Sequence, residues 1–171
     1  MTESGTSADP DHPGEELDPD ETPKQRLDRE LIELLNEVRV ALPGAQVLFA
    51  FLLVLPFQNR FTDLTQLQKD LYAGALMASA AAIALLIAPS SYHRINFRRP
   101  MKESMIRWAN ALLIGGLALA ALGVTLAVAL VIDVALGDVA AVILALGTAL
   151  WFSRFWFVVP LWRRRAFEGG E

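Results

Sequence analysis

The sequence predicts an all-α fold: a four-helix transmembrane bundle, preceded by a cytoplasmic amphipathic helix and a disordered acidic N-terminal tail. Three observations lead to this prediction. Hydrophobic residues make up 54% of the 171 residues, a high share for a soluble protein. Several apolar runs approach the length of about 20 residues that a helix needs to cross a bilayer. Charge is segregated, with acidic residues at the start and arginines between and after the apolar runs.

Residues 1–21 form the predicted acidic tail. They contain eight Asp and Glu residues and no Lys or Arg, so the tail has a net charge of −8. The whole chain has a net charge of −4, and the remaining residues therefore have a net charge of +4. A segment of this composition buries too little apolar surface to offset the entropy lost on ordering, so we expect it to be disordered. It either keeps the protein soluble or pairs with the basic loop described below.

An amphipathic helix is predicted over residues 22–42, at the cytoplasmic interface. Thr22 is a suitable N-cap, Pro23 fits the first helical position, and Gln25 completes a capping box. Apolar residues recur at helical spacing on one face; they are Leu27, Leu31, Leu34, Leu35, Val38 and Leu42. This face is expected either to lie flat in the interface or to pack against another helix, from the same chain or from a partner.

The polar face of this helix mixes acidic and basic residues. Arg26 and Glu30 are four residues apart, as are Arg29 and Glu33, and this spacing allows ion pairs. Helices that bind only lipid favour Lys and Arg on the polar face. The mixture therefore favours protein contact.

The first span is predicted over residues 40–57. The apolar run at 45–57 has only 13 residues, or about 20 Å of helix, whereas a bilayer core is about 30 Å thick. The span therefore needs residues from Val40 onward, which places Pro43 inside the membrane as a kink. Pro43 and Gly44 are the candidate hinge of one bent element that joins the amphipathic helix to the span.

Three further spans complete the predicted membrane domain, residues 40–165, which is followed by a C-terminal tail at 166–171. They are predicted over residues 70–88, 108–132 and 139–159. Thr62 or Asp63 is expected to cap the second helix, and Pro89 to end it. Small residues recur at four-residue spacing in spans two to four, a pattern that lets helices approach closely in lipid.

Basic residues predict the orientation. The loop at 89–107 carries four arginines and one lysine against a single glutamate, and three arginines lie at 163–165. The connections at 58–70 and 133–138 carry few positive charges. By the positive-inside rule both termini are therefore cytoplasmic, and the short second connection makes spans three and four an antiparallel hairpin.

Two runs resemble a known family. They are ETPKQRLDRELIELLNEVRVALPGAQVLFAFLLVLPF and LYAGALMASAAAIALLIAPSSYHRINFR, which together cover about residues 21–99. They resemble an uncharacterised family of small bacterial four-span integral membrane proteins, whose members are sometimes labelled sodium/proton antiporters. The resemblance implies a location in the bacterial plasma membrane and supports four spans. It supplies no catalytic residues.

The candidate functional residues are cations and aromatic residues at the membrane surface. Such a cluster can bind anionic lipid headgroups or a partner; its members are Tyr92, His93, Arg94, Arg98, Arg99 and Arg154. The basic loop can also serve only to set topology. Arg154 either snorkels to the headgroups beside its aromatic neighbours or faces the bundle interior and holds an anionic group.

Several kinds of chemistry lack suitable residues. The chain has no cysteine and two histidines, so cysteine catalysis, disulfides and a histidine metal cluster are excluded. We expect no enzyme activity, no cofactor and no nucleic-acid partner. Apart from Asp70 on the outer approach to the second span, the spans contain no Asp or Glu, which proton or sodium relays use. Polar residues that could line a pore in an oligomer are Gln46, Ser79, Asn110, Thr125 and Thr148.

The leading hypothesis is a non-enzymatic membrane interaction or scaffold protein of the bacterial plasma membrane. It would act through the amphipathic helix and the basic loop. Its expected partners are membrane lipids, anionic ones included, and either further copies of itself or another membrane protein. The alternative is a small oligomeric transporter or channel, with cation/proton antiport as one form.

Overall fold

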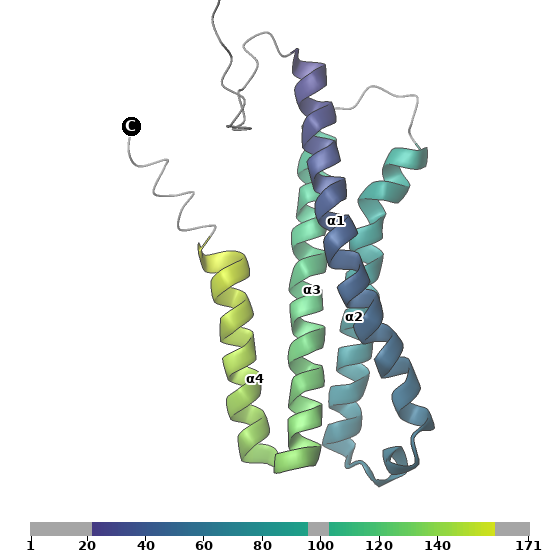
Figure 1. Ribbon diagram of the computed structural model, residues 1–171, viewed down its shortest axis with the longest axis vertical. Coiled ribbons are helices and arrows are strands. Elements are labelled where there is room, and N and C mark those ends of the chain that lie inside the picture. Colours follow the sequence, from purple (N-terminus) through teal and green to yellow (C-terminus); the bar gives the residue numbers. More distant parts are fainter. Residues whose placement is uncertain (1–21, 96–102, 160–171) are drawn as a thin grey trace, which may run out of the picture.

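The computed structural model describes residues 22–95 and 103–159, which form helices and no strand (Figure 1). The long helices are α1 (Pro23–Val54), α2 (Gln66–Ile95), α3 (Glu103–Leu136) and α4 (Asp138–Phe152). Two short 3₁₀ turns, η1 (Leu55–Phe57) and η2 (Asn59–Asp63), join α1 to α2, and a π-helical turn, η3 (Ser153–Val158), extends α4. The acidic tail and the C-terminal arginines lie outside the described residues.

Four helical segments of the described chain are long and apolar enough to cross a membrane. They are Gln25–Phe57, Gln66–Tyr92, Ile106–Leu136 and Asp138–Val158. The helices run alternately up and down, so that the start of α1 and the end of α4 point the same way (Figure 1). The predicted all-α, four-helix bundle of a multi-pass membrane protein is confirmed.

The start of α1 is fixed by the capping box that the sequence predicts. The backbone N–H of Gln25 donates to the Thr22 hydroxyl oxygen at 3.4 Å, and the backbone N–H of Thr22 donates to Gln25 Oε1 at 2.8 Å. Pro23 occupies the first helical position, where its missing N–H costs no intrahelical bond. These contacts satisfy backbone groups that would otherwise have no partner at the helix end.

The helix α1 continues through Pro43 without a break. Its 32 residues correspond to a helix length of about 48 Å. A bilayer core is about 30 Å thick, so the helix is longer than the core. Residues 22–42 and the first span are therefore one helix. Pro43 removes a single backbone donor, and the flanking turns keep their hydrogen bonds.

Two predictions about α2 are wrong. Its cap is Thr65 and not Thr62 or Asp63: the Gln68 N–H donates to Thr65 Oγ1 at 3.3 Å, and the Thr65 N–H donates to Gln68 Oε1 at 2.9 Å. Pro89 does not end the helix, which runs on to Ile95. Pro89 is buried, so packing against the bundle supports the helix around it.

The connection between α3 and α4 is a single residue, Gly137. Its φ of 92° lies in the left-handed region that glycine adopts without strain. The Gly137 N–H donates to the Asp133 carbonyl at 3.1 Å and so closes the end of α3. This tight turn makes α3 and α4 the predicted antiparallel hairpin.

Helix α3 is central, because it packs against α1, α2 and α4. Its contact with α2 is the closest, and two glycines permit it. A Cβ on Gly116 would lie 2.9 Å from the Leu86 side chain, and one on Gly123 would lie 2.7 Å from Ser79 Oγ. Ser79 and Leu86 are almost fully buried. Small residues thus let the two backbones approach, as expected for helices in lipid.

The apolar face of residues 22–42 packs into the bundle. All six of its residues are buried or half-buried. Val38 joins a cluster with Ala45, Leu86 and Leu113, so this core links α1, α2 and α3. The face is therefore already covered by helices of its own chain.

A polar contact joins two helices at the end of the bundle where α2 begins. The Gln68 amide Nε2 donates to Asp133 Oδ2 at 2.9 Å, which joins the start of α2 to the last turn of α3. Phe61 of η2 packs edge-on against Tyr72, with ring centroids 5.1 Å apart. The α1–α2 connection is thereby fixed beneath the bundle.

Candidate functional site

A groove runs between α1 and α4, with a volume of about 720 Å³. We call it the α1–α4 groove. One wall is on α1 and consists of Glu37, Val40, Ala41, Gly44, Ala45 and Leu48. The facing wall is Phe152 and Trp156, and the floor is Ser79 and Leu86 of α2 with Leu117, Ala120 and Val124 of α3.

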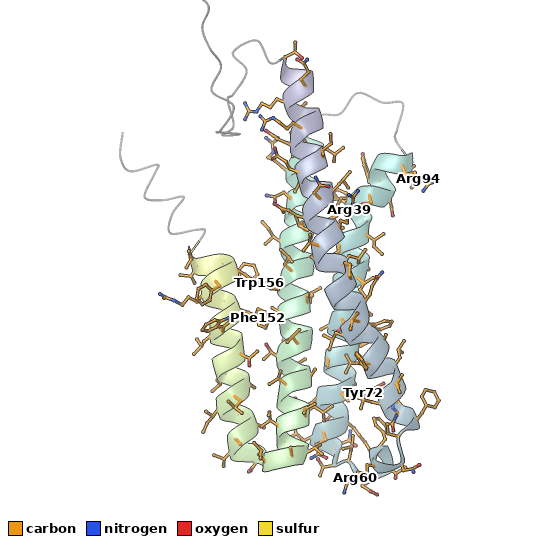
Figure 2. All side chains as sticks on the ribbon, in the orientation of Figure 1. Arg39, Arg60, Tyr72, Arg94, Phe152 and Trp156 are labelled. Carbon is orange, nitrogen blue, oxygen red and sulfur yellow. The ribbon has the colours of Figure 1, made fainter. Side chains whose placement is uncertain are left out.

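The groove exists because α4 is attached on one side only. Among the described residues, α4 packs against α3 and against neither α1 nor α2. Gly44 widens the opening, since no atom lies within 4 Å of the position that its Cβ would occupy. The rings of Phe152, the last residue of α4, and Trp156 of η3 pack edge to face with centroids 4.7 Å apart, and both residues are labelled in Figure 2.

The lining of the groove is apolar apart from two residues. The Ser79 hydroxyl donates to the Ala75 carbonyl at 2.8 Å, so its proton is used within α2. Glu37 is exposed and makes no hydrogen bond or ion pair within the part of the chain that the structure describes. The groove therefore has an apolar interior and one carboxylate on its wall.

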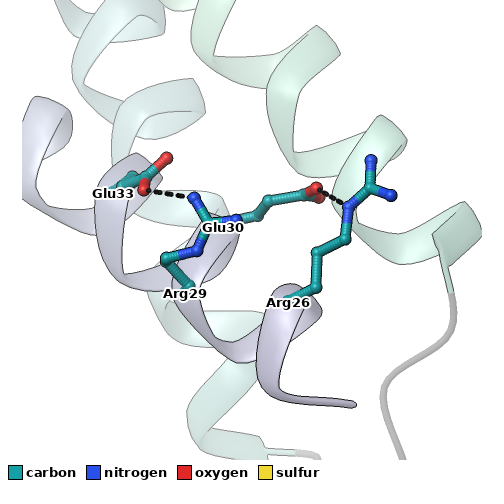
Figure 3. Close-up of polar contacts among 4 residues, drawn as sticks. All are labelled: Arg26, Arg29, Glu30 and Glu33. Atoms are coloured by element: carbon teal, nitrogen blue, oxygen red, sulfur yellow. Dashed lines mark hydrogen bonds and ion pairs between the residues drawn. The ribbon is translucent and has the colours of Figure 1, made fainter. Parts of the chain in front are cut away.

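The other α1 carboxylates near Glu37 have arginine partners (Figure 3). Glu30 Oε1 accepts from Arg26 Nε at 3.0 Å, and Glu33 Oε1 accepts from Arg29 Nη1 at 3.3 Å. Both predicted pairs are thus present. Glu37 has Glu33 and Ala41 at four-residue spacing, so α1 offers it no such partner.

The structure describes part of the predicted basic cluster. The Tyr92 ring packs against Trp108 of α3, with centroids 5.3 Å apart, and Arg94 is exposed and projects from the bundle at the end of α2 (Figure 2). His93 lies in α2, but its side chain is outside the described part. Arg98 and Arg99 lie outside the described residues. Their proposed role in binding stays a prediction.

Arg154 lies on η3 and is exposed. It does not line the groove, although its neighbours Phe152 and Trp156 do. Because α2 and α4 make no contact in the described chain, Arg94 and Arg154 are not brought together. Its exposed side chain fits snorkelling toward headgroups better than a place in the bundle interior.

The candidate hinge residues lie within the unbroken helix α1. Both Pro43 and Gly44 are exposed. The structure adds that Gly44 lies in the wall of the α1–α4 groove. Motion at this point stays a prediction.

The polar span residues are mostly bonded within their own helices. The hydroxyls of Ser79, Thr125 and Thr148 each donate at 2.8 Å to the carbonyl four residues earlier. Gln46 and Asn110 are exposed on the outer surface. In this arrangement each hydroxyl proton is donated to a backbone carbonyl of the same helix.

The proximity of Glu37, Phe152 and Trp156 was not predicted from the sequence. Glu37 was not singled out, and the aromatic residues entered only as neighbours of Arg154. One signal was available: Glu37 is an acidic residue without a basic residue four positions away, unlike Glu30 and Glu33. Its proximity to the aromatic pair depends on the packing of α4, which no local pattern reveals.

Comparison with known proteins extends the resemblance seen in the first two spans. No curated protein and no solved structure matches the chain. A match to a family described as "Family of unknown function (DUF6328)" covers residues 20–160 and so includes all four spans. The chain therefore belongs to the DUF6328 family of unknown function.

Proposed function

We propose that this chain is a non-enzymatic membrane interaction protein of the bacterial plasma membrane. The observation that supports this proposal is the length of α1, about 48 Å against the about 30 Å of a bilayer core. Counted back from Phe57, the far end of the first candidate span, about 30 Å of helix ends at Glu37, which leaves the residues before Glu37 outside the core. We call residues 23–36 the α1 arm; it extends beyond the bilayer as a continuation of a transmembrane helix.

The surface of the α1 arm suits a protein partner. Leu31 is 5% exposed and is held inside the bundle, whereas Ile32 is 59% exposed. The arm therefore has a fixed orientation and presents Ile32 beside the arginine–glutamate pairs. Protein interfaces combine exposed apolar side chains with such locally neutralised polar surroundings. The partner is a second copy of the chain or another membrane protein.

Lipid contact at the same end of the bundle forms the second part of the proposal. Arg94 and Arg107 are both exposed near the loop that joins α2 to α3. Each basic residue near an anionic membrane surface contributes about 1 kcal/mol of attraction. The basic loop thus holds the bundle in the cytoplasmic leaflet while the α1 arm contacts protein.

The test is photo-crosslinking in native membranes, with a photoreactive residue at position 32. We expect protein–protein adducts from Ile32, because its side chain points away from the bundle. A photoreactive residue at Leu31 is the matched control, and its adducts are expected within the chain. If position 32 yields lipid adducts alone, the proposal is wrong.

Orientation can be tested separately, because the chain has no native cysteine. With cytoplasmic termini, Arg60→Cys faces the outside and Arg94→Cys faces the cytoplasm; the two arginines lie at opposite ends of the bundle (Figure 2). An impermeant maleimide should modify Arg60→Cys in intact cells and Arg94→Cys only after permeabilisation. The opposite pattern contradicts the proposed topology.

A further inference from the structure

The α1–α4 groove has the depth of one membrane leaflet. Its wall on α1 extends from Glu37 to Leu48, which is eleven residues or about 16 Å of helix. Half of a bilayer core is about 15 Å. A groove that received a transmembrane helix would be expected to continue across both leaflets. The length therefore favours a ligand that belongs to a single leaflet.

Glu37 lies at the end of the groove nearest the start of α1. From Phe57, at the far end of the first candidate span, to Glu37 is twenty residues, or about 30 Å, the thickness of a bilayer core. Figure 2 shows Arg39 nearer the end where α1 begins than Trp156 and Phe152 are. The carboxylate is thus at headgroup level, and the aromatic pair lies deeper.

We propose that the α1–α4 groove binds a membrane phospholipid, with one acyl chain in the groove and an amine-bearing headgroup against Glu37. The apolar walls match a hydrocarbon chain. The carboxylate of Glu37 has no partner within the described residues, and an ammonium group of the lipid supplies the complementary charge. An ethanolamine headgroup has this chemistry, whereas a glycerol headgroup does not.

Gly44 provides the space for the acyl chain of the lipid. Its position in the wall is open, with no atom within 4 Å of an added Cβ. A Cβ at this position would meet no other atom, and because Gly44 lines the groove, a leucine there would occupy part of its volume. Gly147 of α4 is equally open but does not line the groove, so it is a matched control.

The experiment measures lipid retained by the full-length protein. The protein is purified from nanodiscs of equal phosphatidylethanolamine and phosphatidylglycerol content and examined by native mass spectrometry. We expect one phosphatidylethanolamine per chain in the wild type and in Gly147→Leu, and its loss in Gly44→Leu. Retention in Gly44→Leu overturns the proposal. If instead the wild type carries no lipid and forms a dimer that Gly44→Leu abolishes but Gly147→Leu does not, the groove binds a second copy of the chain. That result also overturns the proposal.

The headgroup is tested by a change that preserves shape. We expect Glu37→Gln to reduce the preference for phosphatidylethanolamine over phosphatidylglycerol by about fivefold, since one charge interaction at the surface is lost. Glu33→Gln, one turn away and outside the groove, is the control. An unchanged preference in Glu37→Gln overturns the assignment of the amine. Because glutamine keeps the side-chain volume, this second experiment remains decisive even if Gly44→Leu folds poorly.

Discussion

Gly123→Leu is expected to push α2 and α3 apart and to destabilise the bundle strongly. A Cβ at this position would lie 2.7 Å from Ser79 Oγ and 3.5 Å from the Ala75 carbonyl oxygen. Ser79 is 1% exposed and its hydroxyl donates to the Ala75 carbonyl, so moving it aside would break that hydrogen bond. Overpacking of this kind costs about 1–3 kcal/mol, and a leucine adds three carbons beyond the Cβ. We expect a loss at the upper end of that range.

Unfolding by sodium dodecyl sulfate in mixed micelles, followed by circular dichroism, measures this loss. Gly147→Leu is the control, because its position is open, and its stability should stay close to that of the wild type. Equal stability of the two variants would mean that α2 and α3 do not pack through Gly123.

Leu86→Ala is expected to have the second large effect. Leu86 is fully buried and joins the cluster that connects α1, α2 and α3. Removal of a buried leucine side chain leaves a cavity and costs about 2–5 kcal/mol. Leu67→Ala is a control on the same helix, since Leu67 is 61% exposed. The same unfolding assay applies, and equal losses in the two variants would contradict the described core.

A second substitution should partly rescue Leu86→Ala. The Cβ of an alanine at position 116 would lie 2.9 Å from Leu86 Cγ and Cδ2, atoms that Leu86→Ala removes. Gly116→Ala should therefore cost stability in the wild type and cost less, or add stability, in Leu86→Ala. We expect a coupling energy of about 0.5–3 kcal/mol. Additive effects would show that the two positions do not touch.

Local sequence signals predicted the local structure well. The Thr22 cap and the Arg26–Glu30 pair each involve residues three or four positions apart, so the pattern alone specifies the contact. The Thr65 cap was missed although Thr65 and Gln68 have the same spacing as Thr22 and Gln25. The error at Pro89 has a physical reason, since tertiary packing outweighs the single hydrogen bond that a proline removes.

The α1–α4 groove could not be predicted from the sequence. Helix α4 has polar residues only at Asp138 and Thr148, so it has no polar face to distinguish the side toward α3 from the side toward lipid. Which helices α4 touches is decided by Gly137 and by the fit of side chains against α3. Glu37 and the aromatic pair are more than a hundred residues apart, and only the packing brings them to one groove.

The attachment of α4 to α3 alone has a consequence for biogenesis. The chain enters the membrane from its N-terminus, and every described contact among α1, α2 and α3 is made by residues before Gly137. This three-helix core can therefore assemble while α4 is still being synthesised. Helix α4 arrives last, docks on a finished surface, and completes the second wall of the α1–α4 groove as the closing step of insertion.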